Sequence, residues 1–405
     1  MTKTENWLGR LIELDIEKVA HGGIFVARHD NRVVFVSNVA PGEKVLAKVF
    51  EDRGGSFCRA EPIKIIQASP QRVPHVWKEA GSGGAGGAEF GHLKLPYQRE
   101  LKSQVLAEAL SRMAGLDIKP VVQPVPGDDD KNGLGYRTRV QLHVSDEGVP
   151  GPFKERSHEV VPVKKLPLAN AEINELGLHL KNWQDVKKIE IASSSTGGMQ
   201  YSIDKKLKGD QKLTERAANR SFRISGKGFW QVHNGAADLL AENVVEMVKD
   251  AGFDTTANNL DLYSGVGLFS GALAATFGKD IRITGVESSK TASADAASNL
   301  VDLKNYKTVA APVESYLRSF TRQSMTIPEA TVILDPPRSG AGKEVINSIL
   351  MIQPRVIIYV ACDPVALARD LSPLMKDGYV LKDIRAFDLF PHTHHFETIA
   401  SLVKE

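Results

Sequence analysis

The sequence contains very few cysteines, two in 405 residues. Two thiols exclude a disulfide framework and a four-thiolate metal site, and such low usage is typical of a reducing cytoplasm. Long apolar runs are also absent, because no uninterrupted stretch approaches the ~18 residues needed to cross a bilayer. The N-terminal sequence, MTKTENWLGRLIELDIEKV, has charges within its apolar stretch and no signal-peptide core. We therefore expect a soluble cytoplasmic protein with no membrane partner.

Net charge is also low, at +2, but it is unevenly distributed. Residues 131–230 contain 18 Lys and Arg against 11 Asp and Glu, a net charge of +7, so the remainder of the chain carries −5. A basic middle beside a mildly acidic remainder fits a polyanionic partner. A solvated charged face is the alternative, and the count alone does not separate the two.

The pattern at the N-terminal end predicts a small β-barrel. Residues 9–67 contain LIELDI, with alternating apolar positions, then RVVFV after a His-Asp-Asn turn and EKVLAKVF after Pro-Gly. About five strands with almost no helical pattern are typical of a closed barrel of the oligonucleotide-binding type. The alternative is a small all-β domain with a purely structural role.

The segment after the barrel contains a loop and a helix. The glycine-rich residues 79–91 are expected to be irregular. Apolar residues with helical spacing over 97–114 predict a helix that ends at Gly115.

The remaining chain predicts two α/β regions. A mixed pattern continues to about residue 225, and we divide the chain into 1–67, 68–225 and 226–405. In the last region the strand-like runs NNLDLY, IRITGVE, ATVILD and RVIIYVAC alternate with helical stretches. Strands separated by helices predict a parallel, doubly wound sheet. Ligands of such sheets bind beyond the carboxyl ends of the strands.

A glycine loop follows the first of these strands, in DLYSGVGLFSG. Gly265 and Gly267 allow a ligand to approach the backbone at the start of a helix. Glu287 ends the next strand, at the usual distance for a carboxylate that binds ribose hydroxyls. A dinucleotide site would prefer a third glycine where this chain has Ser270, whereas S-adenosylmethionine has no pyrophosphate to bind. The pattern therefore indicates a cofactor that contains adenosine.

The later strand ends supply reactive groups. LDPPRSG places Asp335 before a rigid turn, and Arg338 stands where adenine N-methyltransferases have an aromatic residue. Cys362 ends the next strand, where its alternative role is that of a small buried apolar residue. Three histidines in FPHTHHFE are not expected to bind a metal, because no further ligand accompanies them. Glu397 opens the last strand and is expected to face the same cleft.

A thiol, a carboxylate and a methyl-donor site together fit one chemistry. Carbon 5 of uracil is a poor nucleophile, but addition of a thiolate to carbon 6 makes it an enolate that can attack an electrophilic methyl group. A base must then remove the proton from carbon 5 so that the thiol can leave. Cys362 and Glu397 fit these two roles.

Several motifs resemble the bacterial S-adenosylmethionine-dependent RNA uracil-C5 methyltransferases that carry an N-terminal TRAM domain. They are GGIFVAR, VVFVSNVAPGEKV, DLYSGVGLFSGALA, LDPPRSG, VACDPVALARDL and DLFPHTHHFE, in the family's order. The resemblance implies a class I methyltransferase domain with a mostly parallel, seven-stranded sheet, a TRAM barrel over 1–67 and an RNA-binding central α/β region, with helix 97–114 packed on the catalytic domain. It also implies a nucleophile, Cys362, a proton acceptor, Glu397, and an S-adenosylmethionine site lined by Gln231, Tyr263, Gly265, Glu287 and Asp335.

Two departures from the family pattern affect these expectations. The segment that often reads CGGC in members with an iron–sulfur cluster is AGGA here, Ala85 to Ala88, so we expect no cluster. The usual SCNP is ACDP, and a carboxylate at Asp363 is expected to raise the pKa of the neighbouring thiol. Because typical transfer-RNA members of the family lack a TRAM domain, the resemblance favours ribosomal RNA over transfer RNA as the partner, and we expect a monomeric enzyme. The alternatives are an RNA-binding protein on a decayed methyltransferase scaffold and a nicotinamide dehydrogenase.

Overall fold

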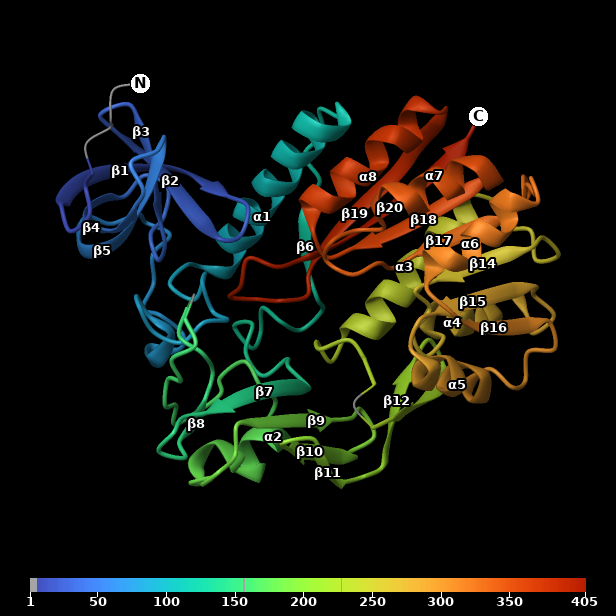
Figure 1. Ribbon diagram of the computed structural model, residues 1–405, viewed down its shortest axis with the longest axis horizontal. Helices are drawn as coiled ribbons and strands as arrows, with labels where there is room; N and C mark the ends of the chain where they lie inside the picture. The colour runs from blue at the N-terminus through green and yellow to red at the C-terminus, as the bar shows by residue number, and fades with distance from the viewer. Residues whose placement is uncertain (1–5, 156, 227) are drawn as a thin grey trace.

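The computed structural model describes residues 6–155, 157–226 and 228–405; residues 1–5 of the expected barrel region and two cations of the basic middle, Arg156 and Lys227, lie outside this description. The N-terminal strands form a closed barrel in the order β1-β2-β3-β5-β4, at one end of the molecule (Figure 1). Its strands are β1 (Leu11–Ala20), β2 (Ile24–His29), β3 (Arg32–Val36), β4 (Lys44–Asp52) and β5 (Phe57–Gln67). Alternate residues of β1 are buried, as its apolar pattern predicts.

A connecting segment with one long helix follows the barrel. Its elements are η1 (Lys78–Ala80), α1 (Leu95–Ala109), a π-helical turn η2 (Leu110–Ala114) and β6 (Val122–Pro124). Gly115 ends the helix with a φ of 71°, in the left-handed region that favours glycine. The π-helical turn changes the angular spacing of its side chains, and the apolar side chain of Met113 within it is 39% exposed. The same helix packs against both the barrel and α8 (Pro364–Lys376).

The middle of the chain forms a five-stranded sheet in the order β11-β10-β9-β7-β8, followed by a separate β12-β13 hairpin. The elements are β7 (Arg139–Val144), β8 (Pro150–Gly151), α2 (Ala171–Leu176), η3 (Leu178–Leu180), β9 (Lys188–Ser193), β10 (Met199–Ile203), β11 (Lys206–Gly209), β12 (Lys212–Ala217) and β13 (Arg220–Ser225). One face of this sheet covers an apolar core to which Ala85 and Ala88 of the AGGA segment also belong. These two side chains are therefore packed as ordinary core residues.

The C-terminal sheet has eight strands in the order β16-β15-β14-β17-β18-β20-β19-β6. Its elements are α3 (Ala236–Asp250), β14 (Asn259–Leu262), α4 (Leu268–Phe277), β15 (Ile283–Glu287), α5 (Lys290–Asn299), β16 (Tyr306–Ala310), α6 (Val313–Arg322), β17 (Thr331–Leu334), α7 (Gly342–Ile352), β18 (Val356–Ala361), α8, β19 (Tyr379–Asp388) and β20 (Glu397–Lys404). The expectation of seven strands is wrong by one, because β6 pairs in parallel with β19 and covers an edge that would otherwise be open.

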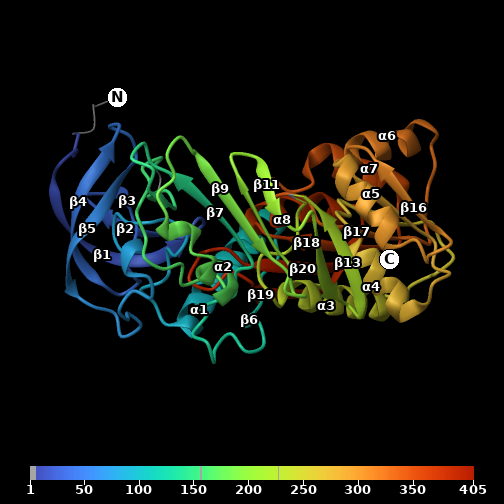
Figure 2. The same ribbon diagram turned by 90° about the horizontal axis from the view of Figure 1, so that it is seen from below.

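Helices cover both faces of this sheet and give it two cores. Apolar residues of α3 and α4 pack on one face, and those of α6, α7, α8 and the end of α1 pack on the other. In the view from below, β7, β9 and β11 lie between the barrel and helices α4 and α5 (Figure 2). None of the helices in the described ranges has the length and apolar character needed to span a bilayer.

Candidate active site

The carboxyl ends of the central parallel strands meet at one edge of the C-terminal sheet. Leu262 of β14 is in register with Val286 of β15 and Leu334 of β17, and Leu334 is in register with Tyr359 of β18. The residues that follow these strands therefore converge. Strand β20 is antiparallel to β18, and Ala361 pairs with Thr398, so the beginning of β20 lies beside the end of β18. This topology places the expected nucleophile and the expected base at the same edge.

Glu397 lies close enough to Cys362 for its negative charge to act on the thiol. Cys362 is partly buried, and burial raises the pKa of its thiol to about 12, with further contributions from the negative charges of Glu397 and Asp335. Glu397 is 6% exposed, and burial followed by repulsion from Asp335 raises the pKa of its carboxyl well above the usual range. Arg338 opposes both shifts. The arginine after the Pro-Pro turn is thus the main favourable charge at the site, a role that our sequence analysis did not assign.

A row of acidic side chains connects this pair with the glycine loop. Burial, then the charge of Asp261, raises the pKa of Asp335 to about 7. Burial also raises the pKa of Asp261 to about 6, and Glu287 adds to that shift. Ser270 donates its hydroxyl to Asp261 Oδ2 at 2.6 Å, which explains why a hydroxyl rather than a third glycine stands at this position. Sequence reasoning missed Asp261, although it lies two residues before the predicted Tyr263.

The glycine loop has the backbone geometry of a ligand cradle. Gly265 has a φ of 54°, its N–H donates to Glu287 Oε2 at 3.1 Å, and the space where a Cβ would project is open. Gly267 precedes α4 with a φ of 92°, and a Cβ there would lie 2.7 Å from Leu300. Tyr263 also has a positive φ, 64°, which is strained for an aromatic residue. A half-exposed carboxylate beside an open glycine loop fits the adenosine part of S-adenosylmethionine.

The structure unites most but not all of the predicted site residues. The charges of Glu397 and Asp335 act on the thiol of Cys362, and the N–H of Gly265 donates to Glu287. Gln231 is buried in the segment before α3, and no hydrogen bond among the described residues joins it to the other expected cofactor residues.

A cavity of about 190 Å³ opens beside Cys362. Six chain segments line it: the β1–β2 turn of the barrel, the segment of Phe90, helix α1, the loop after β17, the loop after β18, and the segment before β20. Its polar lining includes His21, Lys102, Arg338, Cys362, Asp363 and His395. Neither Glu287 and Tyr263 nor Asp335 and Glu397 are among its lining residues. This cavity is the natural place for a substrate that reacts with Cys362.

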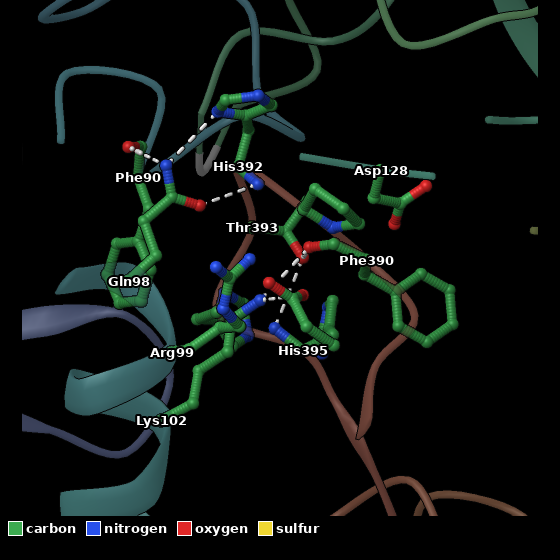
Figure 3. Close-up of polar contacts among 12 residues, drawn as sticks. Phe90, Gln98, Arg99, Lys102, Asp128, Phe390, His392, Thr393 and His395 are labelled. Carbon is green, nitrogen blue, oxygen red and sulfur yellow. Dashed lines mark hydrogen bonds and ion pairs between the residues drawn. The ribbon is translucent and has the colours of Figure 1, made fainter. Parts of the chain in front are cut away.

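The three histidines of FPHTHHFE have structural partners. His392 is 1% exposed; its backbone N–H donates to Gln98 Oε1 at 2.8 Å, and its ring Nδ1 contacts Gln98 Nε2 (Figure 3). The other ring nitrogen, Nε2, contacts the carbonyl of Asn132. His394 Nδ1 lies 3.4 Å from a carboxylate oxygen of Glu89. Across residues 6–155, 157–226 and 228–405, no three His, Cys, Asp or Glu side chains are grouped as metal ligands. His392 thus anchors the segment before Glu397 to helix α1.

Asp363 does not act on the thiol in the way that the sequence suggested. Its Oδ1 accepts hydrogen bonds from the N–H groups of Val365 and Ala366 at the start of α8, and its Oδ2 contacts His21 Nε2 at 2.7 Å. Burial would raise the pKa of Asp363, but these hydrogen bonds, led by that of His21, lower it. The raised pKa of Cys362 instead follows from burial, Glu397 and Asp335. His21, from the barrel, is a contact that no local sequence pattern indicates.

The raised pKa makes the free thiol unreactive, which alkylation can measure. At pH 7.5 a thiol with a pKa of about 12 has a thiolate fraction roughly 10³-fold below that of an ordinary cysteine, so iodoacetamide should label Cys362 at least about 100-fold more slowly than a cysteine peptide. Labelling should speed up as pH rises towards 10, and Arg338→Gln should slow it further. Peptide mass spectrometry in a Cys58→Ala background would measure it. Rapid labelling at neutral pH would contradict the assigned environment.

Comparison with solved structures identifies the fold. The crystal structure of Pyrococcus abyssi tRNA (uracil-54, C5)-methyltransferase in complex with S-adenosyl-L-homocysteine matches with a TM-score of 0.72 and 22% identity, over 96% of this chain and 99% of that chain. At this identity the likeness shows the fold alone. It confirms the predicted class I methyltransferase architecture with an N-terminal barrel.

Sequence comparison identifies the family. A family model described as tRNA (uracil-5-)-methyltransferase matches residues 210–405, and the TRAM domain model matches residues 7–61. An uncharacterised RNA methyltransferase of Streptomyces avermitilis is 37% identical, over 98% of this chain and 98% of its own length. Another from Bifidobacterium longum is 33% identical, over 96% of this chain and 95% of its own. With its glycine loop, its strand-end carboxylates and its barrel, the chain belongs to the family of S-adenosylmethionine-dependent RNA uracil-5 methyltransferases.

Proposed function

We propose that this protein methylates carbon 5 of a uridine in RNA through a covalent bond between Cys362 and carbon 6 of the base. The observation that carries the proposal is the convergence of Cys362, Glu397 and Asp335 at the sheet edge that also holds the glycine loop. A thiol and a buried carboxylate in electrostatic contact, beside a cavity, supply the nucleophile and the base that this chemistry needs.

The first step in this proposal uses Cys362. Its thiolate adds to carbon 6, a sulfur–carbon bond forms, and the electron pair of the 5,6 double bond makes carbon 5 nucleophilic. Bound S-adenosylmethionine would supply the electrophilic methyl group that carbon 5 takes, with its sulfur–methyl bond broken and S-adenosylhomocysteine released. The charge of Arg338 lowers the pKa of the thiol against the opposing effects of burial and the two carboxylates, so Arg338 favours formation of the thiolate.

The second step uses Glu397. Its carboxylate accepts the proton of carbon 5, the 5,6 double bond re-forms, and the sulfur–carbon bond breaks to release the thiolate of Cys362. Burial and the neighbouring Asp335 raise the pKa of Glu397, which makes its carboxylate a stronger base than an exposed glutamate, while Arg338 limits the shift. We assign Gln231, Tyr263, Gly265, Glu287 and Asp335 to the S-adenosylmethionine site.

Two surfaces are suited to hold the RNA. One is the TRAM barrel, and the other is the face of the five-stranded sheet opposite its apolar core. The polar residues that line a groove of about 270 Å³ on that face include two cations, Arg137 and Arg139, one carboxylate, Glu190, and the uncharged Gln141, Gln200 and Ser202. Gln200 is 4% exposed, and its buried Oε1 has no hydrogen-bond partner among residues 6–155, 157–226 and 228–405. Cations and amide groups around a groove are typical contacts for phosphates and base edges.

The proposal also specifies the class of RNA that is methylated. We favour ribosomal RNA, because of the barrel, over transfer RNA, and a monomer as the acting species. The solved Pyrococcus abyssi enzyme, which is named for transfer RNA, matches 96% of this chain. The overall architecture therefore does not by itself distinguish a ribosomal RNA substrate from a transfer RNA substrate. Nucleoside mass spectrometry of fractionated RNA from cells with and without the gene would decide. If no RNA fraction from cells without the gene loses 5-methyluridine, the proposal is contradicted.

Arg137 offers a test of the groove on the central sheet. Arg137→Ala should weaken RNA binding by about 10-fold near 0.1 M salt, and the slope of log affinity against log salt should fall by about 0.7 to 0.9, as expected for one lost phosphate contact. Filter binding over a salt series would measure both. The affinity for S-adenosylmethionine should stay unchanged. Lys382→Ala removes an exposed cation from β19 and serves as the matched control. If the slope of log affinity against log salt is the same for Arg137→Ala and Lys382→Ala, the groove does not contact the RNA.

A further inference from the structure

The turn between the first two barrel strands reaches the cavity beside the expected nucleophile. Residues Ala20, His21, Gly22 and Gly23 line the same cavity as Cys362. In Figure 1 the β1–β2 hairpin extends from the barrel towards helix α1. A domain expected only to hold RNA therefore also forms one wall of the space in which the base would react.

This turn is fitted closely against both loops that carry the reactive groups. His21 Nε2 lies 2.7 Å from Oδ2 of Asp363, the residue after Cys362. At the other side of the turn, a Cβ on Gly23 would lie only 2.8 Å from the Cβ of His394, three residues before Glu397, and Gly23 has a φ of 72°. A residue with a side chain at position 23 would clash with His394 and would also have an unfavourable backbone conformation. The turn thus touches the segments before Glu397 and after Cys362 together.

Asp363 connects this turn with the position of the thiol. One of its carboxylate oxygens accepts from the N–H groups of Val365 and Ala366, at 3.0 and 2.8 Å, and so caps helix α8. The other oxygen contacts His21. Because Asp363 immediately follows Cys362, the carboxylate that starts the helix also fixes the loop that carries the sulfur. The hydrogen bond with Asp363 raises the pKa of His21, which favours the charged form of this pair.

We propose that His21 is a positioning residue of the active site: its contact with Asp363 holds the barrel turn as a wall of the pocket and keeps Cys362 oriented towards the base. This inference rests on the proposed function for the identity of the base, and it assigns the barrel a part in the chemical step as well as in RNA binding. His21 itself exchanges no proton or electron pair with the substrate.

The chain offers a matched control at a second contact between the barrel and the rest of the molecule. Lys18 Nζ lies 3.0 Å from Glu108 of α1, with side-chain exposures of 53% and 37%. Both Lys18 and His21 belong to the β1–β2 hairpin region, and both join the barrel to another segment through an ion pair. Only His21 lines the cavity. Substitution of either Lys18 or His21 should loosen the attachment of the barrel, whereas only substitution of His21 should remove the pocket wall.

The test compares single-turnover methyl transfer at saturating S-adenosylmethionine and saturating RNA isolated from cells that lack the gene. His21→Ala and Asp363→Ser should each lower the rate about 10-fold, since serine still caps the helix but does not reach His21. The double variant should be no slower than either single one, because both changes remove the same contact. His21→Gln, which retains a donor, should recover part of the rate. Lys18→Ala should match the wild type, and RNA and cofactor affinities should change less than about 2-fold in all variants.

Different outcomes would overturn the inference. A wild-type rate for His21→Ala, losses that multiply in the double variant, or a loss confined to RNA affinity would each exclude the positioning role. Alkylation of Cys362 by iodoacetamide, without RNA or cofactor, gives a readout that does not depend on the reaction: His21→Ala should raise the labelling rate several-fold by opening the pocket, and Lys18→Ala should not. If the wild type methylates no RNA but this difference in labelling is found, the proposed function fails and the structural role of His21 stands; equal labelling would overturn that role.

Discussion

Replacing Cys362 by alanine should abolish methyl transfer, with a loss of at least about 10⁴-fold, because removal of a nucleophile leaves only the effects of binding. Without a sulfur–carbon bond at carbon 6, carbon 5 of the base does not become nucleophilic. Transfer of a labelled methyl group from S-adenosylmethionine to RNA would measure the loss. The fold should be retained, since the thiol lies at a loop after β18 and is only partly buried.

Two controls separate loss of chemistry from loss of binding. Calorimetry should show unchanged affinity for S-adenosylmethionine, because Gly265 and Glu287 are untouched by the substitution. Cys58→Ala removes the only other thiol, which is 1% exposed in the barrel core, and should leave the rate unchanged. Methyl transfer by the Cys362→Ala variant at more than trace rates would show that the reaction needs no covalent bond to this residue.

The reactive edge of the sheet could be predicted from sequence because its determinants are local. Apolar runs followed by a turn locate the ends of β15, β17 and β18, and parallel strands bring their carboxyl ends to one edge. Glu287, Asp335 and Cys362 are therefore placed by the strand pattern alone. Glu397 opens a strand instead of ending one, so its place at this edge depends on the antiparallel pairing of β20 with β18, which the strand pattern does not indicate.

Contacts between distant segments could not be predicted in this way. His21 and Asp363 are 342 positions apart, and each belongs to an unremarkable local sequence, a turn and a helix start. The eighth strand, β6, is only three residues long and is stabilised by the free edge of β19, so its own sequence gives little signal. Such features follow from how the barrel and the connecting segment dock on the catalytic sheet.

The electrostatic balance of the site also depends on three-dimensional packing. Asp363, next to the thiol in sequence, directs its carboxylate to the amides of α8 and to His21. Asp335 and Glu397, 27 and 35 positions away from Cys362 in sequence, are the carboxylates that raise the pKa of its thiol after burial. Sequence neighbours point in different directions at the end of a strand, so proximity in sequence is a poor guide to the charge around a reactive group.

Glu397→Gln should separate the two halves of the proposed reaction. The thiolate of Cys362 can still add to carbon 6 and carbon 5 can still take the methyl group, but an amide does not accept the proton of carbon 5. Turnover should fall by about 10²- to 10⁴-fold, the usual contribution of a general base. The change is nearly isosteric and removes a buried carboxylate whose pKa is raised by burial and by Asp335, so the fold should tolerate it.

The arrested reaction should leave a visible product. A covalent complex of protein and RNA should accumulate in the Glu397→Gln variant and migrate slowly on a denaturing gel, with the labelled methyl group in the same band. The Cys362→Ala/Glu397→Gln double variant should form no such band, because the bond is to the sulfur of Cys362. Asp335→Asn is the matched carboxylate control: it removes a neighbouring charge but leaves the proposed base, so it should not trap the adduct. Normal turnover by Glu397→Gln, or an adduct that persists without Cys362, would show that elimination uses another base or that another residue forms the bond.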